Sequence, residues 1–215
     1  MKDLIYFTII GGLFAMNIWS IYKDRKKNNF VYRVVIFSRV MDWLWALLLI
    51  ICVISFAALV EPYLPELLKW NLFSILGKNG TNANIEILKI ASSPSSSSSS
   101  LVIISKLFIL SIFLLFLLLI PKAAYWEEIQ FRSGTTRINK KVIIRNLKFG
   151  LMHCIIGVPI WVGFILGGVG LAYSVRYIRV HKRTSNEDLA LMSCTSLHGK
   201  YNLILILLLA IIVAT

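Results

Sequence analysis

The sequence predicts an all-α protein, a polytopic transmembrane helix bundle of about six spans, and three observations support this fold class. Hydrophobic residues make up 58% of the 215 residues and charged residues only 15%, which is more apolar content than one soluble core of this size can bury. Six runs are long and apolar enough to cross a bilayer. Basic residues cluster between alternate runs, as they do in a bundle with cytoplasmic loops.

Each expected span is a run of about 20 mostly apolar residues. The charged start of the first run and the basic stretch that follows it are typical of an uncleaved signal anchor. Pro159 separates the fourth run from the fifth, because proline lacks a backbone donor and breaks helices, although one kinked or re-entrant helix is the alternative there. The expected spans are Leu4–Tyr22, Trp43–Val60, Leu101–Ile120, Val142 to about Val158, Ile160–Ile178 and Leu189–Val213.

The net charge of +13 gives the expected orientation. Seventeen of the 23 Lys and Arg residues lie in the segments 23–39, 122–148 and 176–183, which follow alternate spans. The positive-inside rule places these segments in the cytoplasm and both termini outside. Basic loops at an anionic membrane surface account for the charge, so the expected partners include membrane lipids and exclude nucleic acid. We therefore expect an integral, multi-pass protein of the plasma membrane.

The chain divides by composition near residue 100. An outer loop from Glu61 to Ser100 ends in a run of serines, which is typical of a flexible, solvated linker. Residues 1–100 then hold the N-terminal spans and this Ser-rich loop. Residues 101–215 form a helix bundle that carries most of the polar residues able to take part in a reaction.

Ionisable groups are costly inside a membrane, so each one near a span is a candidate functional residue. Glu127-Glu128-Ile129-Gln130-Phe131-Arg132 continues the third span on its cytoplasmic side. Glu128 and Arg132 lie four residues apart and can pair on a helix, which leaves Glu127 free about 100° away. The alternative is a solvated juxtamembrane helix with one ion pair.

Two further patterns place histidines in the membrane. Phe149 and His153 share a face of the fourth span, and His198 and Asn202 share a face of the last. Each histidine alone is equally consistent with an interhelical hydrogen bond. The expected topology, however, brings all three patterns to the cytoplasmic half of the bilayer, so a single site built from three helices is geometrically possible.

In this order, E-E-x-x-x-R, F-x-x-x-H and H-x-x-x-N resemble the motifs of the CAAX-protease and bacteriocin-processing family (CPBP, or Abi) of intramembrane proteases, over about Ala123–Ile206. The resemblance implies an endopeptidase in which Glu127 and His153 activate water. It implies that His198 and Asn202 form an oxyanion site. Supporting roles fall to three neighbours, with Phe149 packing beside His153 and Glu128 and Arg132 bracing the first motif. Ser133 departs from the family, where glycine is more frequent.

This resemblance implies a peptide or lipidated protein as substrate, either prenylated or membrane-anchored, cut near the cytoplasmic face. No cofactor is expected, because a glutamate base explains the residues without one. A zinc ion stays open, since family members are often labelled metalloproteases although this chain has no H-E-x-x-H. Two other classes remain: a catalytically silent relative acting as an immunity or scaffold protein, and a small transporter that uses Glu127 and His153 as a proton or cation relay.

Overall fold

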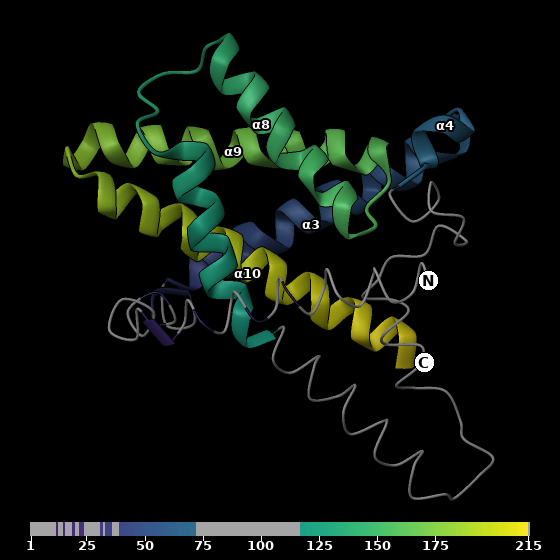
Figure 1. Ribbon diagram of the computed structural model, residues 1–215, viewed down its shortest axis with the longest axis horizontal. Helices are drawn as coiled ribbons and strands as arrows, with labels where there is room; N and C mark the ends of the chain where they lie inside the picture. The colour runs from purple at the N-terminus through teal and green to yellow at the C-terminus, as the bar shows by residue number, and fades with distance from the viewer. Residues whose placement is uncertain are drawn as a thin grey trace, which may run out of the picture.

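The computed structural model describes residues 39–71 and 117–214, together with positions 12, 15, 19, 22, 23, 31 and 33–35. All regular secondary structure in these ranges is helical, as the composition predicts (Figure 1). The elements are α3 (Val40–Val60), η1 (Glu61–Tyr63), α4 (Glu66–Lys69), a helix over 117–132, α8 (Lys140–Met152), η2 (His153–Ile156), α9 (Ile160–Thr184) and α10 (Glu187–Ala214).

Three helices in the described ranges are long and apolar enough to cross a membrane, which indicates a multi-pass membrane protein. They are Val40–Tyr63, Ile160–Thr184 and Glu187–Leu208, and they match the expected second, fifth and sixth spans. Most of the first and of the third expected span lies outside the described residues. The described ranges therefore support the membrane bundle and leave the count of six spans as a prediction.

The fourth expected span differs most from its prediction. Helix α8 has 13 residues and so is about 20 Å long, which is shorter than a full span, and the 3-10 helix η2 continues it directly. Asn139 caps its start by accepting a hydrogen bond from the Val142 N–H at 3.0 Å. The chain then passes through η2 and turns at Gly157, whose φ of 94° suits glycine, before Pro159 precedes α9. Two separate helices form here, so the alternative of one kinked helix is wrong.

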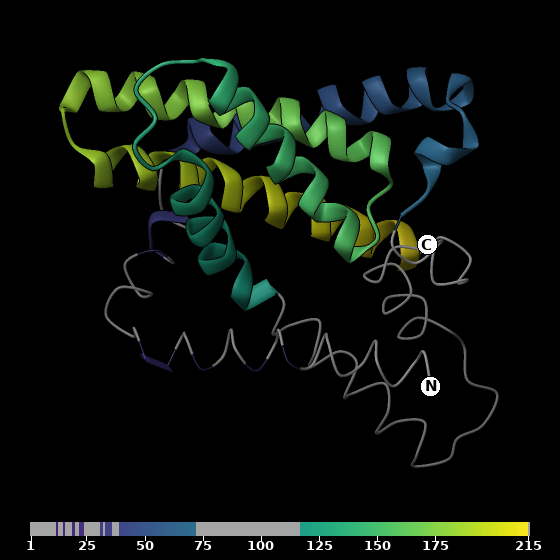
Figure 2. The same ribbon diagram turned by 45° about the horizontal axis from the view of Figure 1, so that its top comes forward.

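Glycines allow α8 and α9 to pack backbone against backbone. A Cβ added to Gly150 of α8 would collide with the backbone of Gly163 and Gly167 on α9. Because only glycine permits so close an approach, the face of α9 that carries Gly163 and Gly167 packs within the bundle. Both views show α8 crossing α9 at an angle (Figures 1 and 2).

Helices α9 and α10 form an antiparallel hairpin. Ser185 turns the chain with a φ of 52°, and the Asn186 side chain then caps α10 by accepting from the Leu189 N–H at 3.0 Å. At this same end, the Ser133 hydroxyl donates to Glu187 at 2.6 Å. The segment after the 117–132 helix and the start of α10 are therefore neighbours.

The opposite end of the bundle holds the turn between α8 and α9. There Asn71 Nδ2 donates to the Gly157 carbonyl at 3.0 Å, and the Ile160 N–H donates to the Trp70 carbonyl at 2.9 Å. The segment before α8 and the turn between α9 and α10 thus lie at one end and residues 70–71 at the other, and the orientation of the bundle in a membrane stays a prediction.

Helix α10 is the most central of the three long helices. In the 18-residue apolar stretch of each helix, 56% of the α10 residues are buried, against 39% in α9 and 11% in α3. The main hydrophobic core joins the 117–132 helix with α3, α8, α9 and α10, and consists of Ala46, Ile50, Phe131, Phe149, Leu166, Val169, Tyr173, Leu197 and Tyr201. Large apolar side chains on the outer face of α3 remain exposed, as a helix facing lipid requires.

Candidate active site

Glu128 lies fully buried at the centre of a cluster of charged groups. Its Oε2 is 3.3 Å from Arg132 Nε, so the predicted pair four residues apart is confirmed, and both side chains are 0% exposed. Its Oε1 is 2.8 Å from His198 Nδ1 on α10. Because a carboxylate held by a guanidinium only accepts hydrogen bonds, Nδ1 carries the proton and donates it. We call Glu127, Glu128, Arg132 and His198 the glutamate cluster.

Glu127 faces the other side of the same imidazole. Its Oε2 is 3.6 Å from His198 Nε2, and its side chain is 28% exposed. His198 therefore lies between two glutamates, one buried and one at the edge. A carboxylate that fixes Nδ1–H leaves Nε2 to exchange protons with a reacting group, which is how catalytic histidines are commonly oriented.

Arg132 is held by aromatic rings as well as by Glu128. Its guanidinium carbon lies 4.2 Å from the centre of the Phe149 ring, a cation–π contact, and Nη2 donates to the Gly170 carbonyl at 3.4 Å. A Cβ on Gly170 would be 2.9 Å from Nη2 and 2.8 Å from a Phe149 ring carbon. Gly170 thus leaves space for the cluster, a role that the sequence pattern does not reveal.

Phe149 connects the two histidines of the candidate site. Its ring makes edge contacts with His153 at 5.1 Å and with His198 at 5.5 Å between ring centres. His153 is half-buried at the start of η2, where its Nδ1 lies 2.9 Å from the Phe149 carbonyl and donates to it. In the described residues Glu127 pairs with His198, and the activation of water by Glu127 and His153 stays a prediction.

Asn202 follows His198 by one turn of α10 and is half-buried. In the described part of the chain, its side chain makes no hydrogen bond to the residues of the glutamate cluster. Both ring nitrogens of His198 face carboxylates. The oxyanion role of His198 and Asn202 therefore stays a prediction.

Tyr173 of α9 belongs to this site and was not singled out from the sequence. It is 0% exposed, and its ring stacks on the His198 imidazole with centres 4.9 Å apart and an angle of 29°. An aromatic residue in an apolar span is most often core, and Tyr173 is also part of the hydrophobic core. Only the hydroxyl, in an otherwise apolar stretch, distinguishes it in the sequence.

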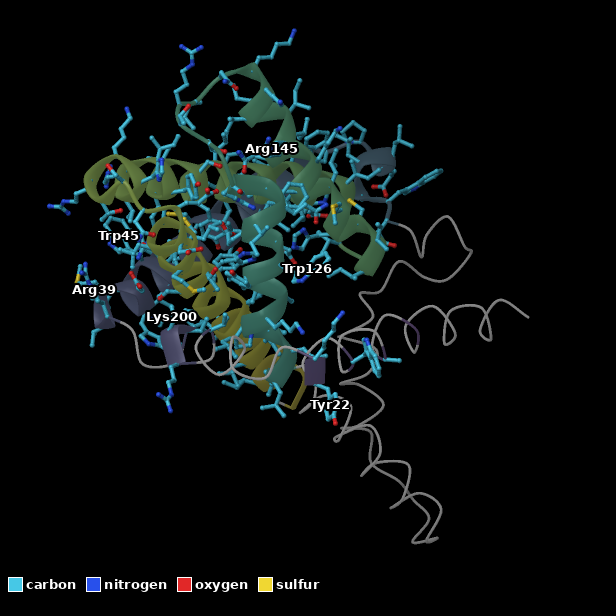
Figure 3. The ribbon with its side chains drawn as sticks, turned by 60° about the vertical axis from the view of Figure 1, so that its left-hand side comes forward. Tyr22, Arg39, Trp45, Trp126, Arg145 and Lys200 are labelled. Atoms are coloured by element: carbon cyan, nitrogen blue, oxygen red, sulfur yellow. The ribbon has the colours of Figure 1, made fainter. Side chains whose placement is uncertain are left out.

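A second polar cluster lies on another side of α10 and was also missed. Asp42 of α3 accepts from Arg176 Nη2 at 2.7 Å through Oδ1 and from the Ser196 hydroxyl at 2.7 Å through Oδ2. Lys200 Nζ donates to the Ser196 oxygen at 3.2 Å and lies 4.0 Å from Asp42 Oδ2. We call Asp42, Arg176, Ser196 and Lys200 the aspartate cluster. Figure 3 labels Lys200 at this side of the bundle.

The donor set of the glutamate cluster does not fit a metal ion. Among the residues that the structure describes, no three His, Cys, Asp or Glu side chains are arranged to hold one. Glu128, the best placed carboxylate, is committed to Arg132 and His198. We therefore derive no step through a metal.

Comparison with family models, with curated proteins and with solved structures finds no match to this chain. The resemblance to the CPBP family thus rests on the three motifs alone.

Proposed function

We propose that the chain is an intramembrane endopeptidase that hydrolyses peptide bonds near the cytoplasmic face of a six-span bundle. One observation carries the proposal. Residues of the three motifs meet, although 70 residues separate Glu128 from His198. His198 of α10 contacts both Glu128 of the 117–132 helix and Phe149 of α8. Phe149 also contacts Arg132, the ion-pair partner of Glu128. A chance occurrence of three short motifs gives no reason for their residues to meet.

The charges of the glutamate cluster favour proton transfer. Two carboxylates face one guanidinium, so one proton shared between Glu127 and His198 makes the cluster neutral. General acid–base catalysis needs such a proton on a group that can release it.

The proposed mechanism starts at Glu127, the carboxylate at the edge of the cluster. Glu127 removes a proton from a water molecule, and the water oxygen forms a bond to the carbonyl carbon of the substrate. The proton then passes to the amide nitrogen as the carbon–nitrogen bond breaks, giving a free amine and a carboxylic acid. Glu128 and Arg132 hold His198, whose Nε2 exchanges the proton with Glu127 during these steps.

The substrate class follows from the family resemblance, which implies prenylated or membrane-anchored peptides, and the plasma membrane is the proposed location. One feature of the surface supports access from lipid. Trp126, next to Glu127, is 63% exposed on the outer side of the 117–132 helix (Figure 3). An apolar segment approaching through the bilayer therefore meets an aromatic side chain beside the edge of the cluster.

A second candidate is a proton relay in a small transporter. The series of contacts from Glu127 through His198 to Glu128 favours this candidate, because carboxylate and imidazole groups in such contact can pass protons. A silent relative that serves as an immunity or scaffold protein has no specific observation in its favour.

The test of the proposed function is cleavage of a fluorescent peptide that ends in a farnesylated cysteine and three further residues, using purified protein in liposomes. We expect Glu127→Gln to lower kcat/KM by about 10²-fold or more, because the general base is lost. Gln130→Ala, an exposed position on the same helix, is the matched control and should cleave normally.

Cleavage that persists in Glu127→Gln would show that the site is elsewhere. If the wild type cleaves neither this peptide nor a set of membrane-anchored peptides, but dissipates a pH gradient in liposomes and Glu127→Gln does not, the transporter is the better description.

A further inference from the structure

The Tyr173 hydroxyl has no role in the mechanism above. The side chain is 0% exposed, and within the described residues its oxygen has no hydrogen-bond partner. Burying a hydroxyl without a partner destabilises a fold, whereas phenylalanine would fill the same space without that cost. A tyrosine here is therefore better explained by something that the hydroxyl binds than by packing alone.

The ring of Tyr173 cannot turn to find another partner. It stacks on His198, and Phe149 lies against it with ring centres 6.5 Å apart. The guanidinium of Arg132 lies 5.5 Å from the ring centre, and the Cys194 thiol donates to the Tyr173 carbonyl at 3.2 Å. Backbone and ring are both fixed, so the hydroxyl has a fixed position beside the glutamate cluster.

The surroundings of the hydroxyl suit an oxygen atom that accepts hydrogen bonds. The Tyr173 ring lies against the His198 imidazole and 5.5 Å from the guanidinium carbon of Arg132, two members of the glutamate cluster. Arg132 Nη1 is a second buried donor without a hydrogen-bond partner in the described part of the chain. Two buried donors, one neutral and one charged, suit an acceptor that enters the cluster and gains negative charge.

On the basis of the proposed function, we infer that the Tyr173 hydroxyl donates a hydrogen bond to the carbonyl oxygen of the peptide bond under attack. That oxygen becomes negative when water adds to the carbonyl carbon, so the hydrogen bond is stronger in the transition state than in the ground state. Tyr173 is then a catalytic residue, and it supplies a donor that the three motifs do not include.

The test compares Tyr173→Phe with Tyr177→Phe, the same change one turn further along α9. Each removes a single buried hydroxyl and keeps the ring. The Tyr177 hydroxyl, unlike that of Tyr173, is satisfied: it donates to Glu187 at 3.1 Å and accepts from the Gly134 N–H at 3.3 Å. With the farnesylated peptide, we expect Tyr173→Phe to lower kcat by about 10²-fold with KM little changed. Its Tm should be unchanged or higher, whereas Tyr177→Phe should lower Tm and leave kcat unchanged.

Two results overturn the inference while leaving the proposed function intact. One is a wild-type enzyme that cleaves and a Tyr173→Phe variant with the same kcat. The other is a Tyr173→Phe variant whose only change is a lower Tm, because the hydroxyl then bonds to a structural group or water.

If the wild type cleaves nothing, the proposed function fails and binding of the same farnesylated peptide decides the inference. Affinity about 10-fold weaker in Tyr173→Phe than in Tyr177→Phe then supports a hydrogen bond to the peptide, since the change removes one bond to a buried oxygen. Equal affinity in the two variants, or no binding by the wild type, overturns it.

Discussion

The two polar clusters of this protein meet α10 at positions only two residues apart, yet they differ in how completely their hydrogen bonds are made. In the aspartate cluster, both carboxylate oxygens of Asp42 accept short hydrogen bonds, from Arg176 and Ser196. In the glutamate cluster, Glu127 Oε2 and Arg132 Nη1 are buried without a hydrogen bond to any described residue. A satisfied network holds helices together, whereas an unsatisfied one leaves groups for a ligand or a proton. The difference favours a structural role for the aspartate cluster and, under the proposed function, assigns the chemistry to the glutamate cluster.

The largest effect should come from removing the centre of the glutamate cluster. Glu128→Ala leaves Arg132 buried without its counter-ion and His198 without its acceptor, and we expect it to lower the free energy of unfolding by about 3–5 kcal/mol. Denaturant unfolding in micelles measures this, with Gln130→Ala as the control. A loss below 1 kcal/mol would mean that the charges are solvated and the cluster is not as buried as described.

A slightly smaller effect should follow from opening the aspartate cluster, and it should leave chemistry unchanged. Asp42→Asn keeps the shape but removes the carboxylate that pairs with Arg176 and lies 4.0 Å from Lys200, so we expect a loss of about 2–4 kcal/mol. For the folded fraction, kcat on the farnesylated peptide should equal that of the wild type. A fall in kcat that exceeds the fall in folded protein would erase the distinction between the clusters.

The smallest effect tests the space around Arg132. Gly170→Ala places a methyl group against Arg132 and Phe149, and we expect it to cost about 1–3 kcal/mol and to lower kcat, because the guanidinium must shift. Gly168→Ala is the matched control on the same helix. A Cβ there meets nothing within 4 Å, so the change should be neutral or stabilise slightly. Equal stability of the two variants would show that Gly170 has no special role.

Sequence spacing predicts contacts within one helix well and contacts between helices less well. The pair of Glu128 and Arg132 follows from four residues of separation, and the gathering of the three motifs follows from the topology. Which histidine meets which glutamate does not follow, because the rotation of each helix about its axis depends on packing. Hence His198, and not His153, lies beside Glu127.

The missed features have a common cause. Asp42 precedes an apolar run and is an ordinary juxtamembrane residue in the sequence, but its partner Arg176 is 134 residues away. Likewise, hydropathy extends the fourth span to Val158, whereas the positive φ of Gly157 ends the helical region earlier. Both depend on tertiary neighbours or backbone angles, which residue type and periodicity do not encode.

The position of both clusters on α10 has a mechanical consequence. Residues two apart on a helix point about 200° from each other, so His198 faces the 117–132 helix while Ser196 and Lys200 face α3. A rotation of α10 about its own axis moves the two sets of side chains in opposite directions. Whatever fixes α3 against α10 therefore also fixes the angle at which His198 meets its glutamates, and α3 is the least buried of the three described helices that could cross a membrane.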